Sequence, residues 1–275
     1  PGQMPWLKEH LTVEQAKNLT MDDIRIQGTF AKALAHIKFF REIMGAAIDI
    51  YCVDTQGPFD LAHLLVGDEI FYAMYDDPEG MHQIMDFCTS LYIRCTEEVK
   101  SVTGENRTSM SHSNSLSLPN AGVRICEDTT TLISREAMLE FVIPYTRRAA
   151  AHFNGAWIHF CGRSDNMTEV LCQCPEVVGL NFGVIPGKED DFDFDRIIPE
   201  LAAHGKVYYG AIPKKSAETG KDYLRRLHRY AETGCFIADG NPSLSGKEPL
   251  DNGSQVLDFW YGLGHSRCAA RPHSS

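Results

Sequence analysis

The chain has 275 residues, of which 43% are hydrophobic and 23% charged, and its formal net charge is −11. One α/β barrel typically takes about 250 residues, and this composition is typical of a globular protein with a large core. The negative charge argues against nucleic acid or an anionic membrane as a partner, because both attract basic patches. With no apolar run near the roughly 20 residues of a membrane helix and no secretory leader, a cytoplasmic protein is expected.

The first 44 residues read as helical, mainly over 21–44, and contain no evident strand. The apolar run 47–53 predicts the first strand, which ends at a polar sequence beginning with Asp54. Two helices follow, and the second has a start signal, because Asp77 can cap it and Pro78 suits its first position. These helices are predicted over 68–75 and 78–103.

Beyond residue 121, short β-rich runs alternate with amphipathic helical segments. The strands are predicted over 122–126, 156–161, 177–182, 206–211 and 235–238. The helices are predicted over 134–153 (capped by Ser134), 165–173, 194–204, 217–233 and 253–262. This alternation indicates right-handed crossovers and a parallel sheet. No glycine-rich phosphate fingerprint follows any strand, so no nucleotide cofactor is expected.

Polar residues gather directly after the predicted strands, which is typical of the catalytic face of a barrel. They are Asp54, Gln56, Glu127, Asp128, His159, Arg163, Asn181, Lys214, Asp239 and Asn241. The six evident strands are fewer than a closed barrel has. We expect a further strand within 108–118 and also the lack of some N-terminal barrel elements. The predicted fold is therefore α/β, a (β/α)8 TIM barrel lacking part of its N-terminal region.

One domain is expected over residues 1–265. The segment 266–275 has no pattern that predicts an element, and its end, Arg-Pro-His-Ser-Ser, is what a common cloning site would encode when read out of frame. We expect this segment to be a non-native or disordered tail. The nine cysteines are odd in number and lie mostly in helix-like or strand-like runs, which favours reduced thiols over a disulfide framework.

Five segments follow one another in an order and at spacings that match a known family. They are Asp54-Thr-Gln-Gly-Pro-Phe, Tyr75-Asp-Asp-Pro-Glu, Cys126-Glu-Asp-Thr-Thr-Thr-Leu-Ile-Ser, Ile158-His-Phe-Cys-Gly and Val178-Gly-Leu-Asn-Phe-Gly. Through this ordered set, the chain resembles the uroporphyrinogen decarboxylase superfamily over residues 39–252. The resemblance implies a TIM barrel with its chemistry at the carboxyl ends of the strands.

The resemblance is closest to the zinc-dependent methyltransferase branch of that superfamily. These enzymes exchange methyl groups between a corrinoid protein and a thiol or an alkyl donor, and hold zinc through His-x-Cys on one strand and a Cys on a later one. His159 and Cys161 match the first part, but Asn241 stands about where the later Cys is expected. The third ligand stays open, and the residues considered for it are Cys235, Cys268 and His112.

The other branch decarboxylates a tetrapyrrole without metal or cofactor. Its members carry an arginine-rich N-terminal segment that grips substrate carboxylates, whereas the first 44 residues here contain only Arg25 and Arg41 as arginines. If this chain were such a carboxy-lyase, Asp54 or Asp128 would steer the pyrrole.

His159 and Cys161 lie two apart on a predicted strand, so their side chains point to the same face. Zinc binds imidazole and thiolate, and a catalytic site leaves one position open for substrate. A thiol bound there would have a lowered pKa and would be held as a thiolate, the nucleophile for methyl transfer. The alternative interpretation is a core cysteine beside a hydrogen-bonded histidine.

Asp128, Glu127 and Asp54 are the catalytic candidates. Asp128 or Glu127 could orient a ligand histidine, bind the metal or act as general acid and base. Alternatively both are carboxylates in a loop before a helix, and neighbours on a strand point opposite ways. Asp54 could instead cap the turn at 57–58. The substrate-binding candidates are Gln56, His112, Asn181 and Asn241.

The leading hypothesis is an enzyme that transfers methyl groups between a corrinoid protein and a thiol or methyl donor, with zinc on His159 and Cys161. The alternatives are a carboxy-lyase of tetrapyrrole biosynthesis and a non-catalytic barrel that binds a small molecule. The expected partners are a small-molecule substrate, a corrinoid protein and a second copy of the chain, because unpaired sheet edges invite pairing. The three hypotheses differ in metal content, tetrapyrrole turnover and response to a methyl-corrinoid.

Overall fold

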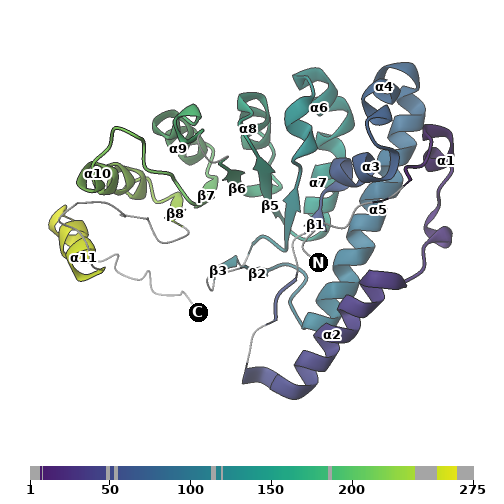
Figure 1. Ribbon diagram of the computed structural model, residues 1–275, viewed down its shortest axis with the longest axis horizontal. Coiled ribbons are helices and arrows are strands. Elements are labelled where there is room, and N and C mark those ends of the chain that lie inside the picture. The colour runs from purple at the N-terminus through teal and green to yellow at the C-terminus, as the bar shows by residue number, and fades with distance from the viewer. Residues whose placement is uncertain are drawn as a thin grey trace. The chain divides into compact units, whose positions relative to one another are not determined.

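The computed structural model of the chain describes residues 7, 9–47, 50–52, 55–112, 116–118, 120–184, 188–238 and 253–264 (Figure 1). They belong to two compact units, Pro1–Gly183 and Val184–Ser275. Within the described ranges, no helix is both long and apolar enough to cross a membrane.

The first unit combines a parallel sheet, a short hairpin and a set of helices. Its strands are β1 (Thr55–Gln56), β2 (Met110–His112), β3 (Leu116–Leu118), β4 (Val123–Cys126), β5 (Ala156–Cys161) and β6 (Val177–Gly183). Its α-helices are α1 (Val13–Lys17), α2 (Gly28–Met44), α3 (Pro58–Val66), α4 (Glu69–Asp76), α5 (Pro78–Thr103), α6 (Arg135–Phe141), α7 (Ile143–His152) and α8 (Asp165–Cys172). Its 3-10 turns are η1 (Met21–Asp23), η2 (Gly45–Ala47) and η4 (Thr129–Leu132).

The sheet of the first unit has the order β1-β4-β5-β6, and all its pairs are parallel. Its register aligns Gln56 with Cys126, Cys126 with His159, and His159 with Asn181. Because side chains alternate between the two faces of a strand, these four residues form one row across one face of the sheet. The other face carries fully buried aliphatic side chains, among them Ile125, Ile158 and Leu180.

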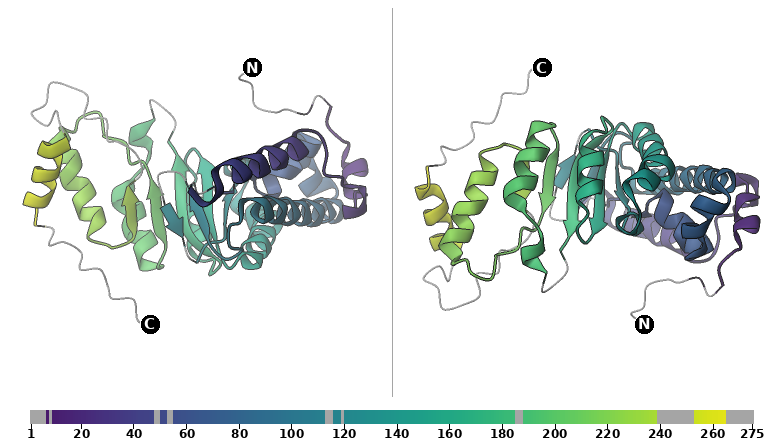
Figure 2. Two further views of the ribbon diagram at one scale, coloured as in Figure 1. Left: turned by 90° about the horizontal axis from the view of Figure 1, so that it is seen from below. Right: turned by 90° about the horizontal axis from the view of Figure 1, so that it is seen from above.

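Helix α5 is the main packing partner of the other helices in this unit. It contacts α2, α3 and α7, and Figure 2 shows α2 and α5 side by side. Its buried residues recur every three or four positions, as a helix with one core face requires, and include Met81, Ile84, Cys88, Tyr92 and Val99. The hydroxyl of Tyr92 donates to the carbonyl of Arg124 at 2.8 Å, which ties this helix to β4.

The ends of α5 follow from its sequence. The Asp77 carboxylate accepts a hydrogen bond from the amide of Gly80 at 3.0 Å, and Pro78 occupies the first helical position, where no N–H is needed. At the other end, Gly104 has a φ of 76°, the left-handed conformation that ends a helix at low steric cost. The predicted start and both bounds of this helix are confirmed.

The second unit contains a parallel strand pair and its helices. The strands are β7 (Val207–Gly210) and β8 (Phe236–Ala238), and Tyr208 aligns with Phe236. The helical elements are η5 (Glu189–Asp191), α9 (Phe194–Ala203), α10 (Gly220–Ala231) and α11 (Gly253–Gly262). Helix α10 is fastened to the loop after β7 by a buried ion pair, in which Nε of Arg226 lies 2.5 Å from Oε1 of Glu218.

Four expectations need correction. The predicted first strand, 47–53, is not seen where it is described: 45–47 form η2, 50–52 have no regular structure, and 48, 49 and 53 lie outside the described residues. The strand there is β1, just downstream, where Thr55 finds Ile125 as its partner. No element is predicted between residues 57 and 67, yet Pro58–Val66 form α3.

The other two corrections concern the middle of the chain. The stretch 108–118 does contain strands, but β2 and β3 pair antiparallel with each other rather than within the parallel sheet. The predicted helix 134–153 is two helices, α6 and α7, because Val142 has a φ of −116°, far from the usual helical value, and Pro144 has no N–H to donate to the carbonyl four residues back.

The remaining predicted strands and helices agree with the structure to within a few residues, so the mixed α/β class with a parallel sheet is confirmed for the described residues. A closed TIM barrel and a single domain over residues 1–265 stay predictions, and the segment 266–275 lies outside the described residues. The eight cysteines in the described part are all free thiols.

Candidate metal centre

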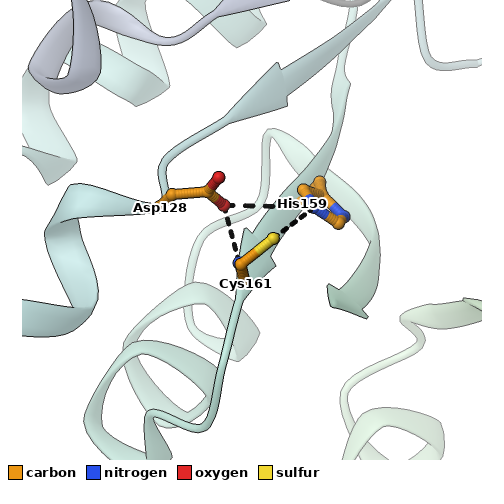
Figure 3. Close-up of side chains that lie close together, drawn as sticks. All are labelled: Asp128, His159 and Cys161. Carbon is orange, nitrogen blue, oxygen red and sulfur yellow. Dashed lines mark hydrogen bonds and ion pairs between the residues drawn. The ribbon is translucent and has the colours of Figure 1, made fainter. Parts of the chain in front are cut away.

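Three side chains that can bind a metal converge at the carboxyl ends of β4 and β5. Asp128, His159 and Cys161 each offer one ligand atom, and these atoms all lie within 4.8 Å of one another. Figure 3 shows the carboxylate, the imidazole and the thiol pointing toward a common point. Sγ of Cys161 is 3.4 Å from Nε2 of His159, and that nitrogen is 3.9 Å from Oδ1 of Asp128.

The strand geometry explains why these three residues meet. His159 and Cys161 are two apart on β5 and therefore share a face. Cys126, the last residue of β4, aligns with His159, so Asp128, two residues further on, arrives beside Cys161. Oδ1 of Asp128 accepts a hydrogen bond from the backbone amide of Cys161 at 2.6 Å, which fixes the carboxylate against the end of β5.

Asn181 orients the imidazole ring of His159. Its side-chain carbonyl oxygen accepts a hydrogen bond from Nδ1 of His159, because β6 places it directly opposite in the register. A histidine that donates from Nδ1 presents the lone pair of Nε2, the atom that faces Asp128 and Cys161. The structure thus places Asn181, a predicted substrate-binding residue, against a candidate ligand.

The electrostatics of the Cys161 thiol favour its protonated form in the absence of a cation. Burial raises its pKa, and the negative charge and hydrogen bond of Asp128 raise it further, while Arg124 acts in the opposite direction. The thiol is nevertheless open to solvent, whereas the His159 side chain is only 13% exposed. The cluster therefore has a nitrogen donor that is mostly covered and a sulfur donor that is open to solvent.

These three donors suit zinc. For bond lengths of about 2.0 Å to nitrogen or oxygen and about 2.3 Å to sulfur, the donor atoms of a tetrahedral site lie roughly 3.3 to 3.6 Å apart. The Sγ–Nε2 distance of 3.4 Å falls within this range. The Nε2–Oδ1 distance of 3.9 Å is about 0.6 Å longer than a nitrogen–oxygen pair would have. The three atoms lie within 4.8 Å of one another, so the Asp128 carboxylate would move toward a bound ion. One nitrogen, one sulfur and one oxygen ligand leave a fourth position for substrate, as catalytic zinc sites do.

Glu127, a predicted catalytic residue, faces away from this cluster. Its side chain is fully buried, and its Oε1 accepts a hydrogen bond from the hydroxyl of Thr146 on α7 at 3.1 Å. Gly57 leaves room for this carboxyl, because a Cβ there would overlap it. Burial raises the pKa of Glu127 well above its ordinary value, and the charge of Asp60 adds to the effect. Burial therefore favours the protonated form of this carboxyl.

Asp60, in the first turn of α3, is a residue that the sequence prediction missed. It is 5% exposed, and its two carboxylate oxygens accept hydrogen bonds from the backbone amides of Asp128 at 2.9 Å and Thr129 at 2.8 Å. Burial raises the pKa of Asp60 to about 6, against the opposing effect of these bonds. The signal that could have revealed it was Gly57-Pro58, which marks a helix start directly before it.

Arg124 is a second residue not singled out in advance. It aligns with Trp157 across β4 and β5, and its guanidinium lies 5.2 Å from the centre of the indole ring, within the range of a cation–π contact. Its side chain lies on the same face of the sheet as that of His159, because Arg124 aligns with Trp157, two residues before His159 on β5. It therefore supplies the positive charge that acts on Cys161.

For the other predicted site residues, the structure describes less of the surroundings or does not describe the residue. Gln56 belongs to the same row as His159, and its Oε1 is buried and accepts no hydrogen bond from the described residues. His112 is the last residue of β2, but its side chain lies outside the described part of the structure. Asp54 and Asn241 also lie outside the described residues.

Comparison with known proteins finds a similar fold among solved structures. No family model and no curated protein matches the sequence. Among solved structures, the chain is similar to a methyltransferase from Methanosarcina mazei, with a TM-score of 0.57 and 16% sequence identity. The match covers 86% of this chain and 65% of that one. At this identity the likeness shows a shared fold, and this chain spans about two thirds of the length of that methyltransferase.

The raised pKa of Glu127 can be tested with Glu127→Gln, an uncharged variant of nearly the same shape. The pKa of Glu127 in the folded protein lies above the unfolded value of 4.5, so the folded state holds this proton more tightly than the unfolded state does. The free energy of unfolding of the wild type therefore falls as the pH rises from about 4.5 toward the folded pKa. The glutamine does not titrate. We expect the variant to cost less than about 1 kcal/mol at neutral pH, and its stability relative to wild type to grow with pH.

Urea unfolding of both proteins between about pH 5 and pH 8 measures this difference. Thr146→Val, which removes the hydroxyl donor without changing the charge, serves as the matched control and should give an offset that varies little with pH. A loss of about 3 kcal/mol or more for Glu127→Gln at the upper end of the range would mean that the carboxyl is ionised and paired.

Proposed function

We propose that this chain binds Zn²⁺ through Asp128, His159 and Cys161 and transfers a methyl group to a thiol substrate. The observation that carries this proposal is the convergence of the three donor atoms within 4.8 Å of one another. The fold likeness to a methyltransferase supports the reaction class, and the motifs that resemble the uroporphyrinogen decarboxylase superfamily support a corrinoid protein as methyl donor. A zinc ion bound there would favour the thiolate form of a substrate thiol, the nucleophile for methyl transfer.

In this proposal Asp128 is the third ligand, where the family pattern has a cysteine. Two features favour it over the other candidates. Its carboxylate is already held beside Cys161 by the amide of that residue. Cys235 precedes β8, at the amino end of that strand, whereas the three donors lie at the carboxyl ends of theirs. A carboxylate in place of a thiolate leaves the site less electron-rich and more open to a fourth, sulfur ligand from the substrate.

The residues around the donors have defined roles in the proposed reaction. Asn181 holds the His159 ring so that Nε2 faces the metal position. Trp157 and the aliphatic side chains behind β5 keep bulk water away from the inner side of the site. Cys161 is open to solvent, so the thiol substrate and the methyl donor approach from that side. Membership of the superfamily, completion of the barrel and a cytoplasmic location are parts of the same proposal.

The first test is the metal content of protein purified anaerobically under reducing conditions. We expect about one zinc per chain by elemental analysis. His159→Ala and Cys161→Ser should each weaken zinc binding by at least about 100-fold, because two protein ligands are too few for a stable site. Asp128→Asn should weaken it by about 10-fold or more, since the amide keeps one oxygen but loses the charge.

Cys95→Ser is the matched control, since Cys95 is a half-exposed thiol on α5 outside the cluster, and it should bind zinc like wild type. A zinc-loaded protein should also consume methylcobalamin when a suitable thiol is present. Absence of zinc, and no uptake on titration, would rule out the methyltransferase proposal and favour the metal-free carboxy-lyase or the non-catalytic barrel. Turnover of a tetrapyrrole by metal-free protein would then separate these two.

The role of Asn181 predicts a contrast between two substitutions. Asn181→Leu removes the oxygen that accepts from Nδ1 of His159, so the ring is free to turn or to change tautomer. We expect zinc affinity to fall by about 10- to 100-fold. Asn181→Asp keeps an acceptor at the same place and should retain most of the affinity. Competition with a chromophoric chelator measures both, and equal loss in the two variants would contradict the assigned role.

A further inference from the structure

Side chains of α3 form hydrogen bonds with the loop that carries Asp128. Both carboxylate oxygens of Asp60 are used: Oδ2 accepts from the amide of Asp128 at 2.9 Å, and Oδ1 accepts from the amide of Thr129 at 2.8 Å. One turn further along α3, Nδ1 of His63 lies 3.1 Å from the hydroxyl of Thr129. Two residues on one side of this helix therefore hold two successive residues of the loop.

Asp128 is held from two directions as a result. Its backbone amide donates to Asp60, and its side-chain Oδ1 accepts from the amide of Cys161 at 2.6 Å. The backbone contact sets where the Cα of Asp128 lies, and the side-chain contact sets where its carboxylate points. Asp60 itself is buried and does not supply one of the three donor atoms. Its charge also acts on the Cys161 thiol, but its hydrogen bonds go to the loop backbone, so it sets the position of a ligand through Asp128.

We propose that Asp60 is a positioning residue of the candidate metal centre, which holds the loop 128–129 so that the Asp128 carboxylate lies beside His159 and Cys161. The effect of Asp60 on metal binding rests on the proposed function, whereas its role in placing the loop does not. An ionised carboxylate suits the task because it accepts two amide hydrogen bonds at once, whereas an asparagine offers only one oxygen.

The first readout needs no metal. Protein labelled with ¹⁵N-cysteine gives one amide signal for each of the nine cysteines, and Cys161→Ser identifies the signal of Cys161. The amide of Cys161 is protected by its hydrogen bond to Asp128. In Asp60→Asn, and more strongly in Asp60→Ala, this amide should exchange with solvent at least about 10-fold faster, because the carboxylate of Asp128 is no longer held in place.

The second readout is the affinity for Zn²⁺ and the visible spectrum of the Co²⁺-loaded protein. We expect Asp60→Asn to weaken zinc binding by about 10-fold and Asp60→Ala by more, in line with other residues that support a metal ligand. The cobalt spectrum of Asp60→Ala should match that of Asp128→Ala. In the double variant the two losses should not add, because both remove the same ligand.

Glu105→Gln is the matched control. Glu105 is a largely buried carboxylate that accepts two backbone amides, those of Cys52 at 2.6 Å and Ser111 at 2.9 Å. It also lies 3.6 Å from the ammonium group of Lys100, and its hydrogen bonds do not involve the Asp128 loop. Its substitution by glutamine should lower overall stability in the same way as Asp60→Asn and leave zinc affinity and Cys161 exchange unchanged. The contrast separates positioning from a general loss of stability.

The outcomes distinguish this inference from the proposed function. If wild type binds no zinc but Cys161 exchange rises in Asp60→Asn and not in Glu105→Gln, the proposed function fails and the positioning role holds. If wild type binds zinc and Asp60→Asn changes neither exchange nor affinity, the positioning role is wrong and the proposed function stands. Additive losses in the Asp60→Ala, Asp128→Ala double variant would also overturn it, since Asp60 would then act by another route.

Discussion

The register of three parallel strands, β4, β5 and β6, is the constraint on which the candidate site depends. It sets Cys126, His159 and Asn181 side by side on one face of the sheet. From this row follow the hydrogen bond that orients the histidine and the arrival of Asp128 next to Cys161. A slip of one residue between β5 and either neighbour would turn the partner's side chains to the opposite face and take the donors apart.

Adjacent carboxyl groups at the end of β4 have opposite environments. Glu127 turns into the core, where burial raises its pKa and Thr146 donates a hydrogen bond to it. Asp128 turns toward the strand ends, where its side chain is 40% exposed and bonds to the amide of Cys161. Asp60 lies between these environments and contacts the backbone of the loop. Of the two adjacent carboxyl groups, only Asp128 is therefore placed to offer a negative ligand to a cation.

Much of the sheet could be predicted from the sequence, because apolar runs of four to seven residues between capped helices leave few alternatives. The pairing of His159 with Cys161 on one face also follows from alternation alone. The role of Asn181 could not be foreseen, since periodicity along a strand says nothing about which residue of the next strand lies opposite. Asp60 and β1 were missed for a related reason: β1 is only two residues long, and both depend on contacts with residues about 70 positions away in the chain.

The central claim, a zinc site with one sulfur ligand from this chain, is tested most directly by X-ray absorption spectroscopy of the zinc-loaded protein without substrate. The account predicts one sulfur scatterer at about 2.3 Å and the remaining ligands as nitrogen or oxygen at about 2.0 to 2.2 Å. Addition of a thiol substrate should raise the sulfur count by one. Two sulfur ligands before any thiol is added would mean that a second cysteine, not Asp128, completes the site, and a shell without sulfur would contradict the account altogether.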